Sequence, residues 1–327
     1  MNLNDFEPRI RESIKKRFHS LDEIKFLQEE ASTRKYYLLR EKDRKEVLCV
    51  DQEVNQEFVE ISQFFEEVGI RASRILSIDS DSACLYQSYI GSEDFSNLEL
   101  EEYKKRIPQL IEILIQFQNL DPPSFVSSRS FDYEKLKWEV DLTLEKFEAF
   151  KKYFSLKTSI PPEMTEFFDV VCKILDRYPK QVFCHRDFHC RNILRDSEDQ
   201  PVLIDFQDAR MGCPQYDLAS LLYDAYYPLP REFRVQMLAE FMSKSQGSDY
   251  KFKETYYLQA LQRSFKALGT YFRMIVDYQK WKFATSIWNC LGNIEEIIQL
   301  GLFPDFLFVF VCELQNDLRK VSEFRSK

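Results

Sequence analysis

Residues 181–209 read QVFCHRDFHCRNILRDSEDQPVLIDFQDA, and this stretch decides the fold of the chain. Two short apolar segments within it, Ile193-Leu194 and Val202–Ile204, predict a pair of strands joined by a polar turn. Such a hairpin folds the chain back on itself. We therefore expect Asn192 and Asp205 to lie close together at its open end.

The same stretch carries the residue types that phosphoryl transfer requires. His185-Arg186-Asp187 is followed five residues after the aspartate by Asn192, and Asp205-Phe206-Gln207 ends the second predicted strand. A carboxylate must orient or deprotonate the acceptor hydroxyl, and oxygen ligands must hold magnesium at the phosphates. Any one of these residues alone is more often a solvated loop residue. Their joint occurrence in a strand–turn context indicates a kinase.

Hydrophobic periodicity predicts a small α/β region followed by a mostly helical one. The expected strands are Ile24–Glu29, Lys35–Arg40, Glu46–Asp51, Ala72–Asp79 and Ala83–Tyr89, with a helix at 54–68. The expected helices are 98–118, 132–153, 163–177, 214–226, 231–245, 252–278, 281–299 and 304–323. The prediction is a bilobal α+β fold: residues 1–91 form a nucleotide-binding lobe with a five-stranded antiparallel sheet, and residues 92–327 form a catalytic and substrate-binding lobe.

Composition excludes several other classes of protein. The net charge of −9 gives no global attraction for nucleic acid or anionic lipid, and no apolar run is long enough to span a bilayer. The charged N-terminus does not resemble a secretion signal, so we expect a cytoplasmic protein. The eight cysteines contain no C-x-x-C pair and are expected to be reduced thiols; a zinc site at Cys184 and Cys190 is the less favoured alternative. Neither a Walker loop nor a GxGxxG fingerprint is present.

The chain resembles the protein-kinase-like fold in the branch of aminoglycoside and choline phosphotransferases. Within that branch it is most similar to bacterial anomeric kinases of N-acetylmuramate and N-acetylglucosamine. The resemblance spans nearly the whole chain. It is carried by Asp205-Phe206-Gln207-Asp208-Ala209, by the stretch 212–222 (GCPQYDLASLL), by the loop 30–37 (EASTRKYY) and by the late-helix stretch 262–269 (QRSFKALG) with Arg273.

The resemblance implies roles for the central stretch. Asp187 is expected to be the catalytic base, and Asn192 and Asp205 are expected to hold Mg²⁺. His185 should brace the loop by hydrogen bonding, and His189 should pack in it. Asp217 should tie the backbone of the catalytic loop together, although an N-terminal helix cap is the alternative interpretation.

The resemblance also implies an ATP site in the first lobe. Ser32 and Thr33 would contact phosphate oxygens, and Gln87, Ser88, Tyr89 and Ile90 would line the adenine. The lysine that such kinases usually carry on the third strand is absent here. Arg34 or Lys35 is the nearest replacement.

The acceptor is a small molecule, and an amino sugar is favoured. The candidate acceptor residues are Glu139, Arg191, Gln207 and Asp208. A kinase of the same fold acting on another metabolite is an open alternative, and a nucleotide-binding pseudokinase scaffold is a weaker one. No partner in nucleic acid or membrane is expected, and the sequence does not indicate an oligomeric state.

Overall fold

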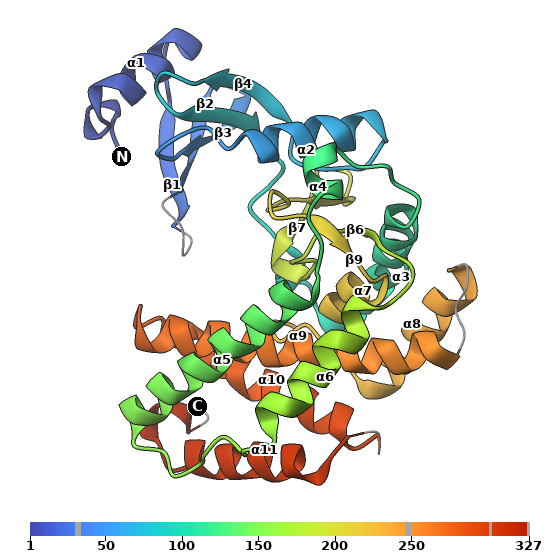
Figure 1. Ribbon diagram of the computed structural model, residues 1–327. Helices are drawn as coiled ribbons and strands as arrows, with labels where there is room; N and C mark the ends of the chain where they lie inside the picture. Colours follow the sequence, from blue (N-terminus) through green and yellow to red (C-terminus); the bar gives the residue numbers. More distant parts are fainter. Residues whose placement is uncertain (30–33, 246–249, 301–302, 326–327) are drawn as a thin grey trace. The chain divides into compact units, whose positions relative to one another are not determined.

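The computed structural model describes residues 1–29, 34–245, 250–300 and 303–325 (Figure 1). Contacts divide the chain into two compact units. The first contains residues 1–95 and 192–208, and the second contains residues 96–191 and 209–327. The hairpin stretch 192–208 therefore groups with the N-terminal residues, whereas Asp187 belongs to the second unit.

The first unit is built on a five-stranded antiparallel sheet in the order β1-β2-β3-β5-β4. This confirms the predicted sheet. Its strands are β1 (Glu23–Glu29), β2 (Lys35–Glu41), β3 (Arg44–Val50), β4 (Ile75–Asp79) and β5 (Cys84–Ser88). Alternation along the strands buries Tyr37, Leu39 and Leu48 on one face, as period-2 patterning requires.

Helix α1 (Pro8–Arg17) covers that buried face, and the sequence reasoning did not identify it. Its Ile10 and Ile14 pack into the sheet core, and a hydrogen bond of 2.9 Å joins the hydroxyls of Ser13 and Tyr86. A 3-10 turn, η1 (Leu3–Asp5), precedes the helix. The short amphipathic pattern was obscured by the many charges of this segment.

Helix α2 (Gln56–Glu67) follows β3, as predicted, and begins where the Asn55 side chain accepts a hydrogen bond from the Phe58 backbone N–H at 2.9 Å. Phe58 stacks on Phe206 with ring centroids 4.4 Å apart, and Phe65 meets the same ring edge-on at 5.2 Å. These aromatic contacts fix the segment that contains Asp205 against α2.

The predicted hairpin is present as β7 (Ile193–Arg195) and β8 (Pro201–Leu203). It is anchored within the first unit by backbone hydrogen bonds from Ser73 N to Leu203 O and from Leu203 N to Arg71 O, both 3.0 Å. The hairpin is thus joined to the segment that connects α2 to β4.

The second unit is mainly helical, as predicted. Its helices are α3 (Leu100–Phe117), α4 (Ser124–Ser127), α5 (Tyr133–Phe154), α6 (Met164–Asp176), α7 (Gln215–Leu222), α8 (Arg231–Lys244), α9 (Tyr250–Val276), α10 (Ala284–Ile298) and α11 (Asp305–Leu318). The shorter elements are β6 (Val182–Cys184), β9 (Arg210–Gly212) and the 3-10 turns η2 (Phe95–Asn97), η3 (Cys190–Asn192), η4 (Trp281–Phe283) and η5 (Ser322–Phe324). None of the helices in the described part of the chain combines the length and apolar character needed to cross a bilayer.

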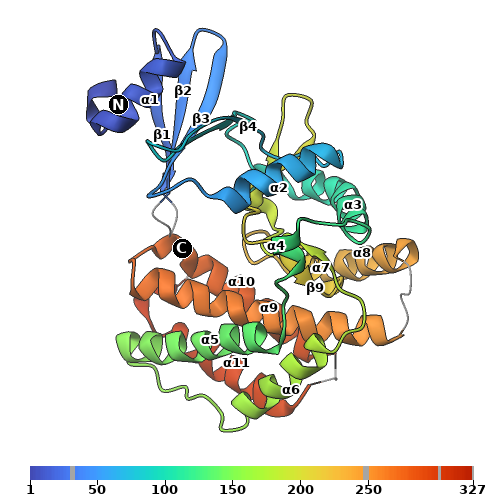
Figure 2. The ribbon, with the colours of Figure 1, turned by 45° about the horizontal axis from the view of Figure 1, so that its top comes forward.

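Helices α5 and α9 run side by side in both views of the ribbon (Figure 2). Gly269 makes their close approach possible, because a Cβ at this position would lie 2.5 Å from Thr143 Oγ1 and 2.7 Å from Thr143 Cα. The contact brings the stretch around Lys266 on α9 next to the stretch around Glu139 on α5.

Candidate active site

The loop that carries Asp187 follows β6 directly in the sequence. It is held in place by hydrogen bonds to a residue of α7. Asp217 accepts hydrogen bonds from the backbone N–H groups of His185, at 2.6 Å, and Arg186, at 3.0 Å. Burial raises the pKa of Asp217 to about 7, against the opposing effect of these N–H groups and of Arg263. Pro214 holds the N-cap position of α7, so the Asp217 carboxylate joins the helix to the loop.

The same two hydrogen bonds stabilise an uncommon backbone conformation. Arg186 has φ of 82°, which places a residue other than glycine in the left-handed region. Such conformations persist where the surroundings over-determine them. The conformation fixes the direction in which the chain presents Asp187.

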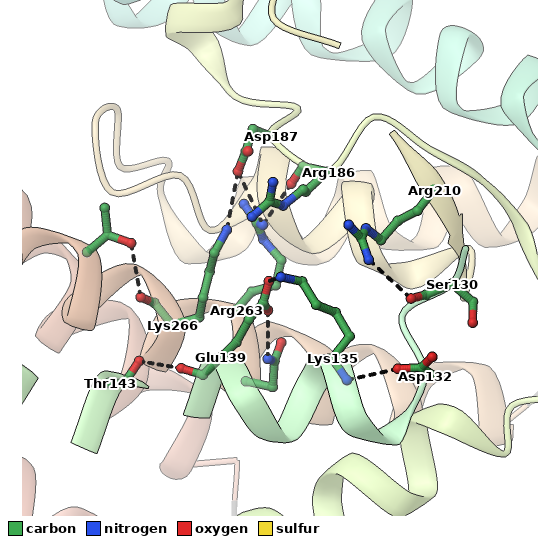
Figure 3. Close-up of polar contacts among 12 residues, drawn as sticks. Ser130, Asp132, Lys135, Glu139, Thr143, Arg186, Asp187, Arg210, Arg263 and Lys266 are labelled. Carbon is green, nitrogen blue, oxygen red and sulfur yellow. Dashed lines mark hydrogen bonds and ion pairs between the residues drawn. The ribbon is translucent and has the colours of Figure 1, made fainter. Parts of the chain in front are cut away.

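Two cationic side chains from α9 face the Asp187 carboxylate (Figure 3). Lys266 Nζ lies 3.3 Å from Asp187 Oδ1, and Arg263 NH1 lies 3.7 Å from the same oxygen. The side chain of Asp187 keeps 29% of its surface exposed, whereas those of Lys266 and Arg263 keep 16% and 10%. Asp187 is therefore accessible, and the two cations behind it are largely buried.

These charges determine the protonation of Asp187. Burial by itself raises the pKa of an aspartate, but Lys266, Arg186 and Arg263 outweigh it and hold the pKa of Asp187 well below its usual range. Burial lowers the pKa of Lys266, while its contact with Asp187 opposes that effect. Asp187 is accordingly ionised at neutral pH and can accept a hydrogen bond.

Arg263 also connects the loop that carries Asp187 to α7. Its guanidinium donates to the carbonyl of Arg186 at 2.8 Å, to the hydroxyl of Tyr216 at 3.0 Å and to the hydroxyl of Ser220. These bonds satisfy a charge that would otherwise be costly to bury. Arg263 is therefore a positioning residue for the loop.

Glu139 on α5 lies at the base of the same cluster and is buried. Its Oε2 accepts a hydrogen bond from Gln262 Nε2 at 3.3 Å, and its Oε1 is 3.9 Å from Lys135 Nζ. Within the part of the chain that the structure describes, Oε1 has no hydrogen-bond partner. The predicted acceptor residue thus presents a buried oxygen that can accept a further hydrogen bond.

The two predicted metal ligands lie together in the first unit. Ile204 N donates to Asn192 O at 3.1 Å, which extends the β7–β8 pairing to the residue next to Asp205. Asp205 has φ of 61° and its Oδ1 accepts a hydrogen bond from Gln207 Nε2 at 2.9 Å. Aspartate is among the residues that tolerate this left-handed conformation best.

This donor set fits magnesium. Mg²⁺ is usually held by one or two carboxylates and keeps water and phosphate oxygens as its other ligands. Asn192 and Asp205 would supply an amide and a carboxylate oxygen from one end of a hairpin. Among the residues that the structure describes, no cluster of three or more His, Cys, Asp or Glu side chains could hold a metal, so a transition-metal site of that kind is not seen there.

Arg34 begins the approach to β2 and points toward the residues that follow β3. Its Nε is 4.0 Å from Asp51 Oδ2, and its side chain is 18% exposed. Burial lowers the pKa of Arg34, but Tyr36 and Asp205 raise it by more, so that the pKa lies above its usual value. Lys35 is exposed. Ser32 and Thr33 lie outside the described residues.

The predicted adenine residues follow one another at the end of β5. Gln87 is buried and accepts a hydrogen bond from Ser73 Oγ at 3.0 Å. Ser88 accepts from Arg74 N at 3.0 Å, and Tyr89 and Ile90 come directly after the strand. Their assignment to adenine remains a prediction.

The other predicted acceptor residues are divided between the units. Gln207 and Asp208 belong to the first unit, where Gln207 is buried beside Asp205. Arg191 belongs to the second unit, with its guanidinium carbon 3.8 Å from the centroid of the Tyr226 ring. His189 packs edge-on against the same ring at 5.1 Å.

Sequence reasoning assigned no role to Lys266, Arg263, Lys135 or Arg210. Arg263 and Lys266 are three residues apart, which places them on one face of a helix, and both fall in the late-helix stretch already noted as similar to a family motif. That spacing was an available signal for a paired cationic face. Lys135 and Arg210 offered no comparable signal, because single charges are common on helix and strand surfaces.

Comparison with known proteins agrees with this geometry. The profile of the family described as "Phosphotransferase enzyme family" matches residues 23–249. The N-acetylmuramate/N-acetylglucosamine kinase of Neisseria meningitidis serogroup B is 23% identical over 311 residues, which cover 90% of this chain and 91% of that protein.

Solved structures with the same fold include two small-molecule kinases. An aminoglycoside phosphotransferase in complex with gentamicin has a TM-score of 0.59 at 14% identity, covering 93% of this chain and 98% of that one. The choline kinase LicA from Streptococcus pneumoniae has a TM-score of 0.55 at 12% identity, covering 88% and 98%. At these identities the likeness establishes the kinase-like fold.

Proposed function

Because the chain belongs to the phosphotransferase enzyme family, we propose that it is an ATP-dependent kinase that phosphorylates the anomeric hydroxyl of an amino sugar. N-acetylmuramate and N-acetylglucosamine are the candidate acceptors, since a full-length relative carries their names. The observation that carries the proposal is the ionised Asp187 with Lys266 and Arg263 behind it. We also propose that the reaction takes place in the cytoplasm, where ATP is supplied.

The chain's residues would divide the transfer as follows. Asp187 accepts a hydrogen bond from the acceptor hydroxyl and aims its oxygen at the γ-phosphorus. The new O–P bond forms as the bond to the bridging oxygen of ADP breaks, and the hydroxyl proton passes to Asp187. Lys266 and Arg263 keep the carboxylate ionised and in place until that transfer.

The first unit supplies the nucleotide side of the proposed reaction. Asn192 and Asp205 would hold Mg²⁺, which neutralises charge on the phosphates when bound. Arg34 would provide a protein cation in place of the absent strand lysine. Its raised pKa keeps it charged at any pH at which the enzyme works.

The electrostatics of Asp187 favour an anomeric acceptor. A carboxylate with a strongly lowered pKa is a weak base, and general-base catalysis by such a group works best on an acidic proton. The anomeric hydroxyl of a hemiacetal is more acidic than an ordinary sugar hydroxyl. A weakly basic Asp187 can therefore deprotonate the anomeric hydroxyl, whereas an ordinary alcohol would require a stronger base.

A panel of acceptors with Mg·ATP and ADP detection tests the proposal. We expect turnover with an amino sugar, loss of its reducing end and formation of phosphate that mild acid releases. ADP release with the reducing end retained would contradict the anomeric assignment and leave the kinase assignment in place. Turnover only with choline or an aminoglycoside would replace the acceptor class, and nucleotide binding without turnover on any acceptor would indicate a scaffold.

A further inference from the structure

Asp224, a buried residue two positions after the end of α7, contacts the loop that carries Asp187. Its Oδ2 accepts a hydrogen bond from the backbone N–H of Cys190 at 2.9 Å, and its Oδ1 accepts one from the backbone N–H of Tyr226 at 2.7 Å. The residue is only 4% exposed. An N–H group left unpaired in the interior costs free energy, so this carboxyl group joins the two backbone segments.

Asp187 therefore lies between two anchoring aspartates. Asp217 binds the backbone N–H groups of the two residues before it, and Asp224 binds the backbone three residues after it. Between these points the N–H of His189 donates to the carbonyl of Asp187 at 3.1 Å, which closes a tight turn. The direction of the Asp187 side chain is thus set by backbone that is hydrogen-bonded on both sides of it.

The turn that contains Asp224 is itself held from α10. Asn289 Nδ2 donates to the carbonyl of Ala225 at 2.9 Å, and Asn293 Nδ2 donates to the carbonyl of Tyr223 at 2.9 Å. These two carbonyls flank Asp224 in the sequence. The backbone that carries its carboxyl group is therefore hydrogen-bonded to a neighbouring helix on either side.

Side-chain contacts join the same turn and loop. The guanidinium carbon of Arg191 lies 3.8 Å from the centroid of the Tyr226 ring, and the His189 ring meets that ring edge-on with centroids 5.1 Å apart. Tyr226 also packs against Tyr271 of α9, with ring centroids 5.7 Å apart. The same helix supplies the two cations that face the proposed base.

We infer that Asp224 is a positioning residue for Asp187. By holding the N–H of Cys190, it fixes the direction in which the loop presents the Asp187 carboxylate to the acceptor hydroxyl. The inference rests on the proposed function and adds a residue to it. Such positioning affects turnover strongly, since a displacement of about 1 Å at the reacting atoms can cost about 10²-fold in rate. Because Asp224 is buried, we assign it no contact with either substrate.

A double-mutant cycle tests whether Asp224 acts through Asp187. Asp224→Asn keeps the size of the side chain but replaces one accepting oxygen by an NH₂ group. We expect kcat to fall by about 10- to 100-fold, with the KM values for ATP and the acceptor changed by less than about twofold. In the Asp187→Asn background the same substitution should change the residual kcat by less than about twofold, because the group that it positions is already absent. Asp176→Asn, at an exposed position at the end of α6, should leave kcat unchanged in both backgrounds.

Two results would overturn the inference. Equal losses of kcat in the two backgrounds would show that Asp224 acts independently of Asp187, as a residue with a purely structural role does. A raised KM for ATP or for the acceptor with an unchanged kcat would assign Asp224 to binding.

A milder substitution covers the case in which thermal unfolding shows that Asp224→Asn does not fold. Asn289→Ala removes a single neutral hydrogen bond from the same turn. We expect it to lower kcat by about two- to tenfold, and this loss should disappear in the Asp187→Asn background. A loss that persists there would overturn the inference.

Failure of the inference can be distinguished from failure of the proposed function. If the wild-type protein phosphorylates no acceptor, the proposed function fails, and hydrogen exchange measured by mass spectrometry still tests whether Asp224 holds the loop. Peptides that contain Cys190 should lose protection in Asp224→Asn, whereas peptides from α11 should keep theirs. Unchanged protection at Cys190 would overturn the inference.

Discussion

The two compact units bring different chemistry and are built by different forces. In the first, Asn192 and Asp205 come together through the local pairing of one hairpin, and Arg34 is the cation coupled to Asp205. In the second, Asp187 faces two cations that come from a single helix far away in the sequence, α9. The difference shows that local pairing is enough to bring the two proposed metal ligands together, whereas the charges around the proposed base depend on how separate helices pack.

The largest expected effect separates the two units by function. Asp187→Asn should lower turnover by about 10²- to 10⁴-fold, as loss of a general base does, while Mg·ATP still binds. Asp205→Ala should instead abolish magnesium-dependent nucleotide binding, because it removes the charged metal ligand. Titration of Mg·ATP into both variants measures the difference. Equal binding losses would show that the division of labour is wrong, and Glu198→Gln at an exposed position of the hairpin turn provides the control.

The second expected effect concerns the cation behind the base. Lys266→Met should lower kcat/KM by about 10- to 100-fold at neutral pH, the range for a charged hydrogen bond. Because Lys266 lowers the pKa of Asp187, its loss should raise that pKa and add a fall in activity on the acid side. Lys266→Arg keeps the charge and should remove the alkaline fall that deprotonation of Lys266 causes. A Met variant whose pH profile superimposes on that of the wild type would exclude this role.

The third prediction tests whether helix packing holds the second unit's cluster. Gly269→Ala places a methyl group against the backbone of Thr143, so we expect the free energy of unfolding to fall by about 1–3 kcal/mol. Gly292 on α10 has nothing within 4 Å of an added Cβ. Gly292→Ala should therefore stabilise the protein by about 0.5–1 kcal/mol. Denaturant unfolding measures both, and similar effects at the two positions would refute the close-packing explanation.

The smallest expected effect concerns the cation that would contact the phosphates of ATP in the first unit. Arg34→Ala should raise the KM for ATP by about tenfold, since it removes one charge-assisted contact to phosphate. Lys35→Ala, at the exposed neighbouring position, should change it much less. If Lys35→Ala raises the KM for ATP and Arg34→Ala does not, Lys35 is the replacement for the strand lysine. If neither changes the KM, backbone N–H groups hold the phosphates.

Local patterns along the chain were enough to predict the fold class and the residues of the hairpin. The alternation of β1 to β5, the helix after β3 and the turn between β7 and β8 follow from local periodicity and turn chemistry, and the structure has all of them. Asp187, Asn192 and Asp205 could be named because their spacing along one stretch is itself the signal. Helix α1 was missed because it has few apolar residues. Their role is apparent only from their packing against the sheet.

The charges that surround Asp187 could not be predicted from the sequence and became apparent only in the folded structure. Lys266 and Arg263 lie more than seventy residues after it, and they reach it because α9 packs against α7, whose Asp217 holds the loop of Asp187. Lys135 and Arg210 meet through the pairing of β6, β9 and the segment before α5. A periodic pattern along the chain indicates which residues lie on the same face of one helix or strand. Coulomb interactions depend on distances through space, and those distances are set by how separate elements pack.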